Sequence, residues 1–295
     1  MIDPSFDITG AIDVHVHAGP ELFTRLGDAF DVARRARDAG MAGIVLKCHH
    51  ESTVARAYFT RKAVEGIEVW GGITLNQFVG GINPVAVAAA LDSGGRFVWM
   101  PTMHADHHIK LLGAGTYGVP TMTVSKGATI TEGLTVLDAN GALTPETLQI
   151  IQMIALRDAV LCTAHLSEIE IAAVVRACRD NGAKCVVTHA FFPRHTIEFL
   201  TEMADLGAII EVSAVVAYPM ARHLMPGMTL AMARDLVRAV GAERMVISTD
   251  SGQIHNPWPA DILRAFSNSM IAVGVTKDEL RRMVVDQPRR LLGLD

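Results

Sequence analysis

The sequence lacks several features that would assign it to a class at once. No stretch approaches 18 consecutive apolar residues, so we expect no transmembrane helix and no membrane attachment. The first ten residues carry Asp3 and Asp7 where a secretory signal carries positive charge, and we therefore expect a cytoplasmic protein. Lysine and arginine (26) are outnumbered by aspartate and glutamate (31), which gives a net charge of −5, and they form no basic block. Nucleic acid is therefore not an expected partner.

The chain is also poor in cysteine. Its four cysteines form no Cys-x-x-Cys pair and lie within apolar or helical patterns, so we expect reduced, mostly buried thiols and no disulfide. Half of the 295 residues are hydrophobic, enough for a large core in one α/β barrel or in two smaller domains. Because we find no internal repeat and no linker, we expect one domain over residues 1–295.

Short apolar runs alternate with longer amphipathic runs along the chain. The predicted strands lie at 11–16, 43–48, 67–75, 95–101, 159–165, 184–189, 208–214 and 244–250. The predicted helices lie at 28–40, 53–63, 84–91, from 145, at 167–182, 196–206, 230–240 and from 259. Nearly continuous apolar strands are typical of a parallel sheet covered on both faces, and eight such units predict a (β/α)8 TIM barrel with helices 276–292 packed beneath it. The alternative is an open doubly wound sheet, but no Gly-x-Gly-x-x-Gly follows the first strand.

One segment interrupts this alternation. Residues 104–143, after the fourth predicted strand, are rich in glycine and threonine, and the part from 118 on is hairpin-like rather than helical. We expect an excursion over the C-terminal face of the barrel, acting as a lid or as a contact in a homo-oligomer.

Polar residues gather where the predicted strands end. The stretch AIDVHVHAGPE places His15 and His17 at the end of the first strand, although about half of one such pair is expected by chance among 12 histidines. Residues i and i+2 of a strand point to the same face, so both imidazoles can bind one ion. His165, His189 and Asp250 end three later strands, and Lys47 ends the second. Histidines and a carboxylate at the C-terminal mouth of a barrel indicate a site for Zn²⁺ or a similar divalent ion such as Mn²⁺.

This order of residues resembles the amidohydrolase superfamily of metal-dependent hydrolases, with His-x-His after strand one, single histidines after strands five and six, and an aspartate after strand eight. The resemblance implies a distorted (β/α)8 barrel with one or two divalent metals. It implies that His15, His17 and Asp250 bind the first metal, and that His165 and His189 bind a second, or that His189 transfers a proton.

The chain departs from that pattern at strand four, where two-metal members usually carry a bridging carboxylated lysine or a glutamate. The segment FVWMPT offers neither. Lys47 is the only lysine inside the apolar run of a predicted strand, and burial of an ammonium is costly. Three roles stay open for Lys47: a carboxylated bridging ligand, a group that binds an anionic substrate, or a nucleophile.

We therefore expect a metal-dependent hydrolase that uses a metal-activated water on a small-molecule carbonyl-type substrate, such as an amide, ester or lactone. Asp250 would accept the proton of the water, while Lys47 or His189 would stabilise the developing anion. Arg25 and His104 are candidates for substrate binding. The alternatives are a mononuclear decarboxylase or hydratase of the same superfamily, a Schiff-base lyase of the aldolase type built on Lys47, and a non-catalytic metal-binding barrel. The remaining histidines near strand ends, one of each adjacent pair at most reaching the site, are expected on surface loops: His49, His50, His104, His107 and His108.

Overall fold

The computed structural model describes residues 5–124, 132–192, 195–218 and 229–294. Its strands run in parallel, each paired with its neighbours in sequence order, in one sheet of three strands and one of six. They are β1 (Ile12–His17), β2 (Gly43–Lys47), β3 (Glu68–Trp70), β4 (Gly72–Thr74), β5 (Phe97–Trp99), β6 (Val160–Cys162), β7 (Lys184–Val187), β8 (Ile209–Ser213) and β9 (Met245–Ser248). β3 and β4 are the two halves of one predicted strand, separated at Gly71.

The first strand and the segment after the last strand lie side by side. The backbone N–H of His17 donates to the Ser251 carbonyl at 2.8 Å, and the N–H of Asp250 donates to the His15 carbonyl at 2.8 Å. The ladder is nevertheless not closed within the described residues, since β3 and β4 belong to different sheets and β1 meets this segment through one isolated pair, Val16 with Ser251. The predicted α/β barrel architecture is confirmed, with eight parallel strand positions and an interrupted ladder.

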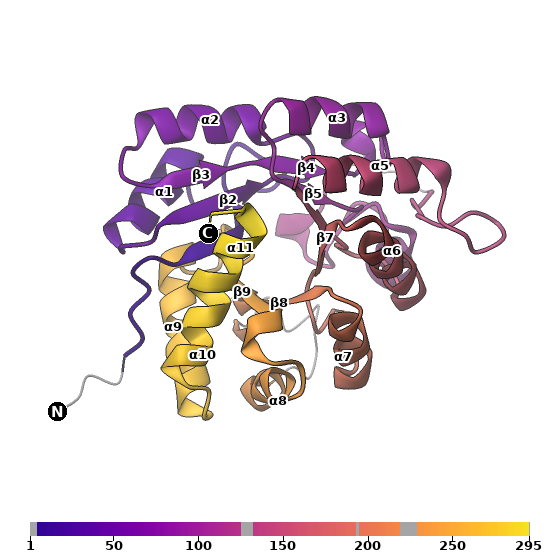
Figure 1. The fold of residues 1–295 in the computed structure, drawn as a ribbon. Helices are drawn as coiled ribbons and strands as arrows, with labels where there is room; N and C mark the ends of the chain where they lie inside the picture. Colours follow the sequence, from indigo (N-terminus) through magenta and orange to yellow (C-terminus); the bar gives the residue numbers. More distant parts are fainter. Residues whose placement is uncertain (1–4, 125–131, 193–194, 219–228, 295) are drawn as a thin grey trace.

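Helices cover the outside of the strands, as Figure 1 shows. They are α1 (Ala29–Asp38), α2 (Val54–Ala63), α3 (Pro84–Asp92), α5 (Pro145–Leu156), α6 (Glu168–Asn181), α7 (Ile197–Asp205), α8 (Leu230–Val240) and α9 (Pro259–Ala272). The predicted helix signals act locally: Ser167 and Glu170 form a capping box at the start of α6, and Gly182 ends it at φ +68°. Every residue of β1 and β2 is buried, as expected for parallel strands between helices and a filled barrel interior.

The C-terminal helices lie at the N-terminal ends of the strands, which confirms their predicted place beneath the barrel. They comprise α10 (Lys277–Arg281), a π-helical turn η7 (Arg282–Asp286) and α11 (Gln287–Leu292). Arg96, which precedes β5, donates to the Leu292 carbonyl at 2.9 Å, and Lys184, at the start of β7, donates to the Leu291 carbonyl at 3.1 Å. The polar C-terminal end of α11 is thereby bound to two strands.

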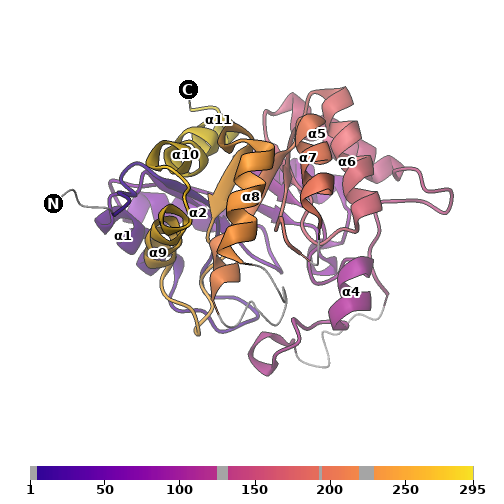
Figure 2. The ribbon, with the colours of Figure 1, turned by 90° about the horizontal axis from the view of Figure 1, so that it is seen from below.

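The excursion between β5 and α5 contains a helix that the sequence did not predict, α4 (Asp106–Leu112), which lies outside the row of barrel helices in Figure 2. Its antiparallel pairing is limited, among the described residues, to the isolated pairs Thr116 with Thr123 and Leu137 with Leu143. Part of the predicted hairpin, 125–131, lies outside the described residues. Tyr117, Met122 and Val124 of the excursion form a small apolar cluster with Phe23 and Met103. None of the described helices is long and apolar enough to cross a membrane.

Candidate metal centre

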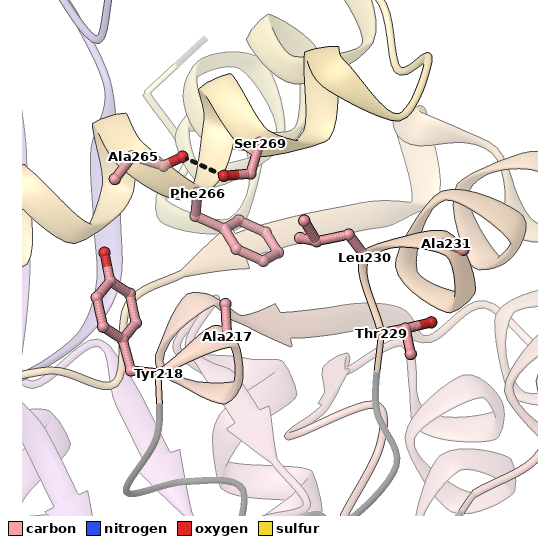
Figure 3. A pocket seen from close by; sticks show the side chains of 8 residues that line it. All are labelled: Ala217, Tyr218, Thr229, Leu230, Ala231, Ala265, Phe266 and Ser269. Carbon is pink, nitrogen blue, oxygen red and sulfur yellow. Dashed lines mark hydrogen bonds between the residues drawn. The ribbon is translucent and has the colours of Figure 1, made fainter.

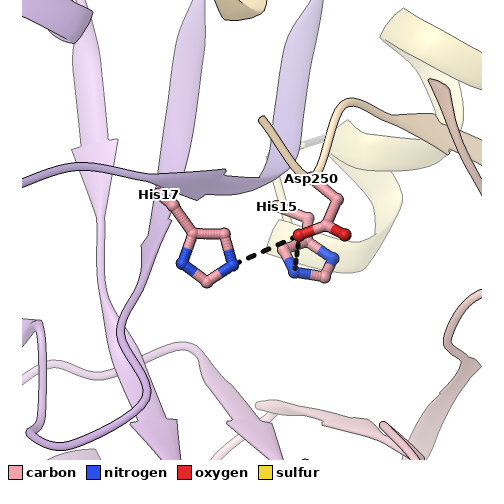
Figure 4. Close-up of side chains that lie close together, drawn as sticks. All are labelled: His15, His17 and Asp250. Atoms are coloured by element: carbon pink, nitrogen blue, oxygen red, sulfur yellow. Dashed lines mark ion pairs between the residues drawn. The ribbon is translucent and has the colours of Figure 1, made fainter. Parts of the chain in front are cut away.

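Two histidines and an aspartate from opposite ends of the chain converge on one point (Figure 4). Asp250 Oδ1 lies 3.1 Å from His15 Nε2 and 3.2 Å from His17 Nε2. The histidines occupy alternate positions of β1 and therefore project to the same side, while Asp250 follows β9. Ligand atoms of all three residues lie within 4.8 Å of one another. The Asp250 side chain is 18% exposed, compared with 1% and 2% for the imidazoles, so solvent reaches the cluster at its carboxylate.

Three strands end in the same unusual backbone conformation. Ala164, His189 and Asp250 each follow the last residue of their strand, β6, β7 or β9, by two positions, with φ of 52°, 57° and 51°. Left-handed conformations are uncommon for residues other than glycine, and they persist where surrounding contacts fix them. The turns aim His189, Asp250 and, one residue after Ala164, His165 into the mouth of the barrel.

A buried carboxylate orients His15. Glu211 of β8 lies 2.8 Å from His15 Nδ1 and also accepts from the Ser248 hydroxyl. When Nδ1–H donates to Glu211, the lone pair of Nε2 is left facing Asp250. This carboxylate–histidine arrangement is typical of histidines that bind metals, so the donor set of His15, His17 and Asp250 fits a divalent ion.

The pKa shifts within this cluster favour charged carboxylates. Burial raises the pKa values of Asp250 and Glu211, but the neighbouring histidines outweigh burial and lower both below their ordinary range. Burial and the Lys47 ammonium lower the pKa of His15, but Asp250 and Glu211 more than offset them, so the net shift is upward. The carboxylates of the cluster are therefore ionised and able to bind a cation.

A buried ion pair lies beside His17, and its carboxylate, Glu21, was missed by sequence analysis. The side chain of Glu21 is buried, forms an ion pair with Arg25 and lies 3.6 Å from His17 Nδ1. Arg25 Nη2 is 3.1 Å from the same nitrogen, while Arg25 Nη1 has no hydrogen-bond partner among the described residues. Burial raises the pKa of Glu21, but Arg25 and His49 outweigh it and hold that pKa well below the ordinary range. The structure thus places Arg25, predicted to bind substrate, beside the cluster and pairs it with Glu21.

The prediction that His49, His104 and His108 lie on the surface is wrong, because all three are at most 3% exposed. His49 stacks on His17 with ring centres 4.7 Å apart, contacts Glu21, and lies 2.8 Å from the Tyr117 hydroxyl. Tyr117 of the excursion contacts His49 and Thr116 contacts His108, and sequence spacing gives no sign of these contacts. His50 and His107 are half-buried.

His104 does not join the cluster. Its Nδ1 accepts from the backbone N–H of Gln77 at 3.0 Å, and its ring packs against Phe78 at 4.6 Å. Its Nε2 is buried without a hydrogen-bond partner among the described residues. Substrate binding by His104 therefore stays a prediction.

Lys47 lies against His15. Its Nζ is 3.0 Å from His15 Nε2 and 5.6 Å from the centre of the Trp99 ring, and the residue is 2% exposed. Burial lowers the pKa of Lys47, an effect opposed by Asp250 and Glu211. The lysine predicted from the second strand thus faces the same point as the two histidines.

His165 and His189 form a second pair beside the first. Their ring centres are 5.3 Å apart, and the ring of His189 is 5.3 Å from that of His15. His189 Nδ1 is hydrogen-bonded to Ser213 at 2.8 Å, and its Nε2 is 3.9 Å from Asp250 Oδ2. Burial lowers the pKa of His189 to about 4 and that of His165 well below its ordinary range. Both imidazoles are therefore neutral near pH 7, the form that binds metals.

Residues 10–211 match the model of a family of unknown function, DUF6282. The chain belongs to this family. No curated protein matches the DUF6282 chain.

Solved structures resemble the DUF6282 chain in fold. A Pseudomonas putida protein named after 2-pyrone-4,6-dicarboxylic acid hydrolase has a TM-score of 0.62 and 18% identity, with 98% of each chain covered. An amidohydrolase from Pseudomonas aeruginosa has a TM-score of 0.59 and 12% identity, over 96% of this chain and 95% of the other. A dipeptidase described as a metallopeptidase has a TM-score of 0.60 and 14% identity, over 96% of this chain and 98% of the other. The predicted resemblance to the amidohydrolase superfamily is confirmed for the fold.

Sequence analysis also missed Asp13 of the DUF6282 chain. It is completely buried, accepts from the backbone N–H groups of Thr249 and His15 at 3.0 and 3.2 Å, and accepts from the Thr249 hydroxyl. Burial raises the pKa of Asp13 to about 7. Asp13 links β1 to the turn that carries Asp250, a contact between residues too distant in sequence for any local pattern to reveal.

A separate pocket of about 480 Å³ lies between η4 (Ala214–Ala217), α8 and α9 of the DUF6282 chain (Figure 3). Its described lining residues are mostly apolar and include no histidine, cysteine or carboxylate. It is lined by Ala217, Tyr218, Thr229, Leu230, Ala231, Ala265, Phe266 and Ser269.

Proposed function

We propose that the chain is a metal-dependent hydrolase acting on a small-molecule carbonyl-type substrate. The observation that carries this proposal is the convergence of His15 Nε2 and His17 Nε2 on Asp250 Oδ1, at 3.1 and 3.2 Å, with Glu211 bound to the other nitrogen of His15. Two imidazoles, one of them oriented by Glu211, and a carboxylate at the mouth of a barrel are suited to a catalytic ion, which needs protein ligands on one side and an open position on the other.

The names of the fold neighbours favour the same reaction class. One is named after a hydrolase of a pyrone dicarboxylic acid, one is an amidohydrolase, and one is a dipeptidase described as a metallopeptidase. The alternatives, a decarboxylase or hydratase and a Schiff-base lyase built on Lys47, are not favoured. The Schiff-base alternative also leaves the convergence of His15, His17 and Asp250 without a role.

The proposed chemistry divides among the chain's own residues. A bound divalent ion supplies an acidified water and a polarised substrate carbonyl. Asp250 is the partly exposed carboxylate of the cluster, and we assign it the proton from that water and its delivery to the leaving group. His189 Nε2, 3.9 Å from the second oxygen of Asp250, and the Lys47 ammonium are the groups placed to stabilise negative charge on the substrate oxygen.

Imidazole and carboxylate ligands favour Zn²⁺, with Mn²⁺ as another candidate. His165 and His189 would bind a second ion if the site is binuclear, and a carboxylated Lys47 would bridge the two. We place the protein in the cytoplasm, a proposal supported by four buried free cysteines, and we retain a homo-oligomer as a prediction.

Two measurements test the proposal. Elemental analysis of protein purified without a polyhistidine tag is expected to give one or two equivalents of a divalent metal. A panel of lactones, esters and dipeptides, followed with parallel detection of CO₂, is expected to show hydrolysis without CO₂ release.

The variant Asp250→Asn should keep much of the metal and lose turnover by about 10³-fold or more, as expected for removal of a proton acceptor in a catalytic constellation. Asp261→Asn, on the surface of α9, is the matched control and should keep wild-type turnover. Turnover of Asp250→Asn equal to wild type would overturn the role of Asp250, and a chain that takes up neither Zn²⁺ nor Mn²⁺ would overturn the metal site.

A further inference from the structure

The excursion contributes a buried histidine whose contacts the proposed chemistry does not use. His108 of α4 is fully buried, and its Nδ1 lies 2.7 Å from Nδ1 of His165. Its Nε2 lies 2.9 Å from the backbone carbonyl of Thr116. The planes of the two imidazoles differ by 14° and their centres are 4.9 Å apart. Because the nitrogens approach much more closely than the centres, the rings meet edge to edge through a hydrogen bond.

The direction of this hydrogen bond follows from the Thr116 carbonyl. A carbonyl oxygen only accepts, so His108 Nε2 carries the proton and donates to Thr116. A neutral imidazole with a protonated Nε2 has its lone pair on Nδ1. His108 Nδ1 therefore accepts, and the proton between the two rings belongs to His165 Nδ1. A cationic His108 would lack compensation, since none of its hydrogen bonds within the described part of the chain involves a carboxylate.

We propose that His108 is a positioning residue that fixes the tautomer of His165, so that Nε2 of His165 keeps its lone pair for a ligand in the barrel mouth. The inference rests on the proposed function for the nature of that ligand, a divalent ion, and on geometry alone for the tautomer. The inference gives the excursion a chemical role. The Thr116 carbonyl fixes the tautomer of His108, and His108 in turn fixes the tautomer of His165.

Tyr117, the next residue of the excursion, fixes the tautomer of a second histidine, His49. The Tyr117 hydroxyl lies 2.8 Å from His49 Nε2, while Nδ1 of His49 contacts the Glu21 carboxylate. A carboxylate accepts, so His49 Nδ1 carries the proton, and its Nε2 accepts from Tyr117. Two consecutive residues, Thr116 and Tyr117, thus orient two histidines that each support a candidate ligand.

Two variants of His108 distinguish the effect of losing the hydrogen-bond acceptor from the effect of changing the side-chain volume. His108→Asn places an amide oxygen near the position of Nδ1 and keeps an acceptor for His165, whereas His108→Leu keeps comparable bulk and removes it. His107→Leu, on the same helix and without a hydrogen bond to His165, is the matched control. Circular dichroism and thermal unfolding identify any variant that fails to fold.

The first readout is ¹⁵N nuclear magnetic resonance of histidine-labelled protein without metal, with His165 assigned from a His165→Gln variant. We expect Nδ1 to be protonated in wild type, His107→Leu and His108→Asn, and both tautomers to be populated in His108→Leu. A wild-type His165 protonated on Nε2, or a His108→Leu spectrum unchanged at His165, overturns the proposal.

The second readout is Zn²⁺ affinity, measured by competition with a chromogenic chelator. Loss of a partner that orients a metal ligand typically weakens metal binding by about 10- to 100-fold. We expect a loss of that size in His108→Leu and a change below about 3-fold in His108→Asn. Equal affinity in His108→Leu and wild type overturns the role toward the ion. A wild type that binds no Zn²⁺ overturns the proposed function instead, and the tautomer measurement then still decides the role of His108.

Discussion

His15 and Asp250 are joined twice. The backbone N–H of Asp250 donates to the His15 carbonyl at 2.8 Å, and Asp250 Oδ1 lies 3.1 Å from His15 Nε2. The hydrogen bond that holds the end of β9 against β1 therefore also sets the distance between the two side chains. Any change that separates these backbones is expected to disrupt the candidate metal site.

Gly252 allows this approach. It has a φ of +136°, and a Cβ added there would lie 2.0 Å from the His17 carbonyl oxygen. We expect Gly252→Ala to lower the free energy of unfolding by about 2 kcal/mol or more, since the strained backbone and the clash add. It should also weaken Zn²⁺ binding by at least about 10-fold because Asp250 moves away from His15 and His17. Urea denaturation and chelator competition measure the two effects.

Gly182→Ala is the matched control for this variant. Gly182 also has a positive φ, +68°, but an added Cβ would meet nothing within 4 Å. We expect Gly182→Ala to lower the free energy of unfolding by about 1 kcal/mol and to leave the Zn²⁺ affinity unchanged. A Gly252→Ala protein that behaves like Gly182→Ala would contradict the close approach.

Glu211→Gln tests how His15 is oriented. The substitution keeps the shape of the side chain but removes the charge beside His15 Nδ1. We expect Zn²⁺ affinity to fall by about 10- to 100-fold with the fold retained. Glu170→Gln, a buried glutamate that caps α6 and accepts from Thr135, controls for loss of a buried charge and should leave Zn²⁺ affinity unchanged. Equal Zn²⁺ affinities in the two variants would show that Glu211 does not orient His15 for metal binding.

The buried His104 predicts a loss of stability in mild acid. Burial lowers its pKa to about 4 in the folded protein, compared with about 6.5 in the unfolded chain. The unfolded chain therefore binds the proton first, and the free energy of unfolding falls as the pH decreases from about 6.5 to about 4, by at most about 1.4 kcal/mol per pH unit. Urea midpoints at pH 7, 6 and 5 should show a weaker pH dependence for His104→Asn, which can still accept from Gln77. The same dependence in both proteins would show that His104 is not responsible.

Ser167→Ala tests the start of α6, two residues after His165. Ser167 and Glu170 satisfy each other's backbone groups in a capping box, so we expect a loss of about 1 kcal/mol of stability without a change in Zn²⁺ affinity. Chemical denaturation gives the first quantity. A fall in affinity would show that the helix start controls the position of His165.

Most of the architecture was predictable, because its signals are local. A parallel strand buried on both faces is a short apolar run, and predicted strand 11–16 corresponds to β1 at Ile12–His17. Caps such as Ser167 and Gly182 mark helix ends within a few residues. The helix α4 was missed because its seven residues, DHHIKLL, are too few to give a periodic signal.

Part of the site was predictable for the same reason, and the rest was not. His15 and His17 share a face because of the strand period, a property of neighbouring residues. Burial of Glu21 depends on Arg25 and His49, and burial of His49 depends on Tyr117. A glutamate after a Gly-Pro pair has the composition of an exposed loop. Only the tertiary contacts of the excursion turn these residues into neighbours of the candidate ligands.

The hydrogen bonds from Arg96 and Lys184 to the carbonyls of Leu292 and Leu291 have a consequence for folding during translation. A ribosome delivers the chain from its N-terminus, so the carbonyl partners of Arg96 and Lys184 emerge 196 and 107 residues after these two cations. Ser251, which follows β9 and pairs with Val16 of β1, is also synthesised long after β1. Contacts between segments so distant in sequence form slowly. The nascent protein therefore carries an open barrel until the segment after β9 has emerged, and acquires its candidate metal site only when Asp250 reaches His15.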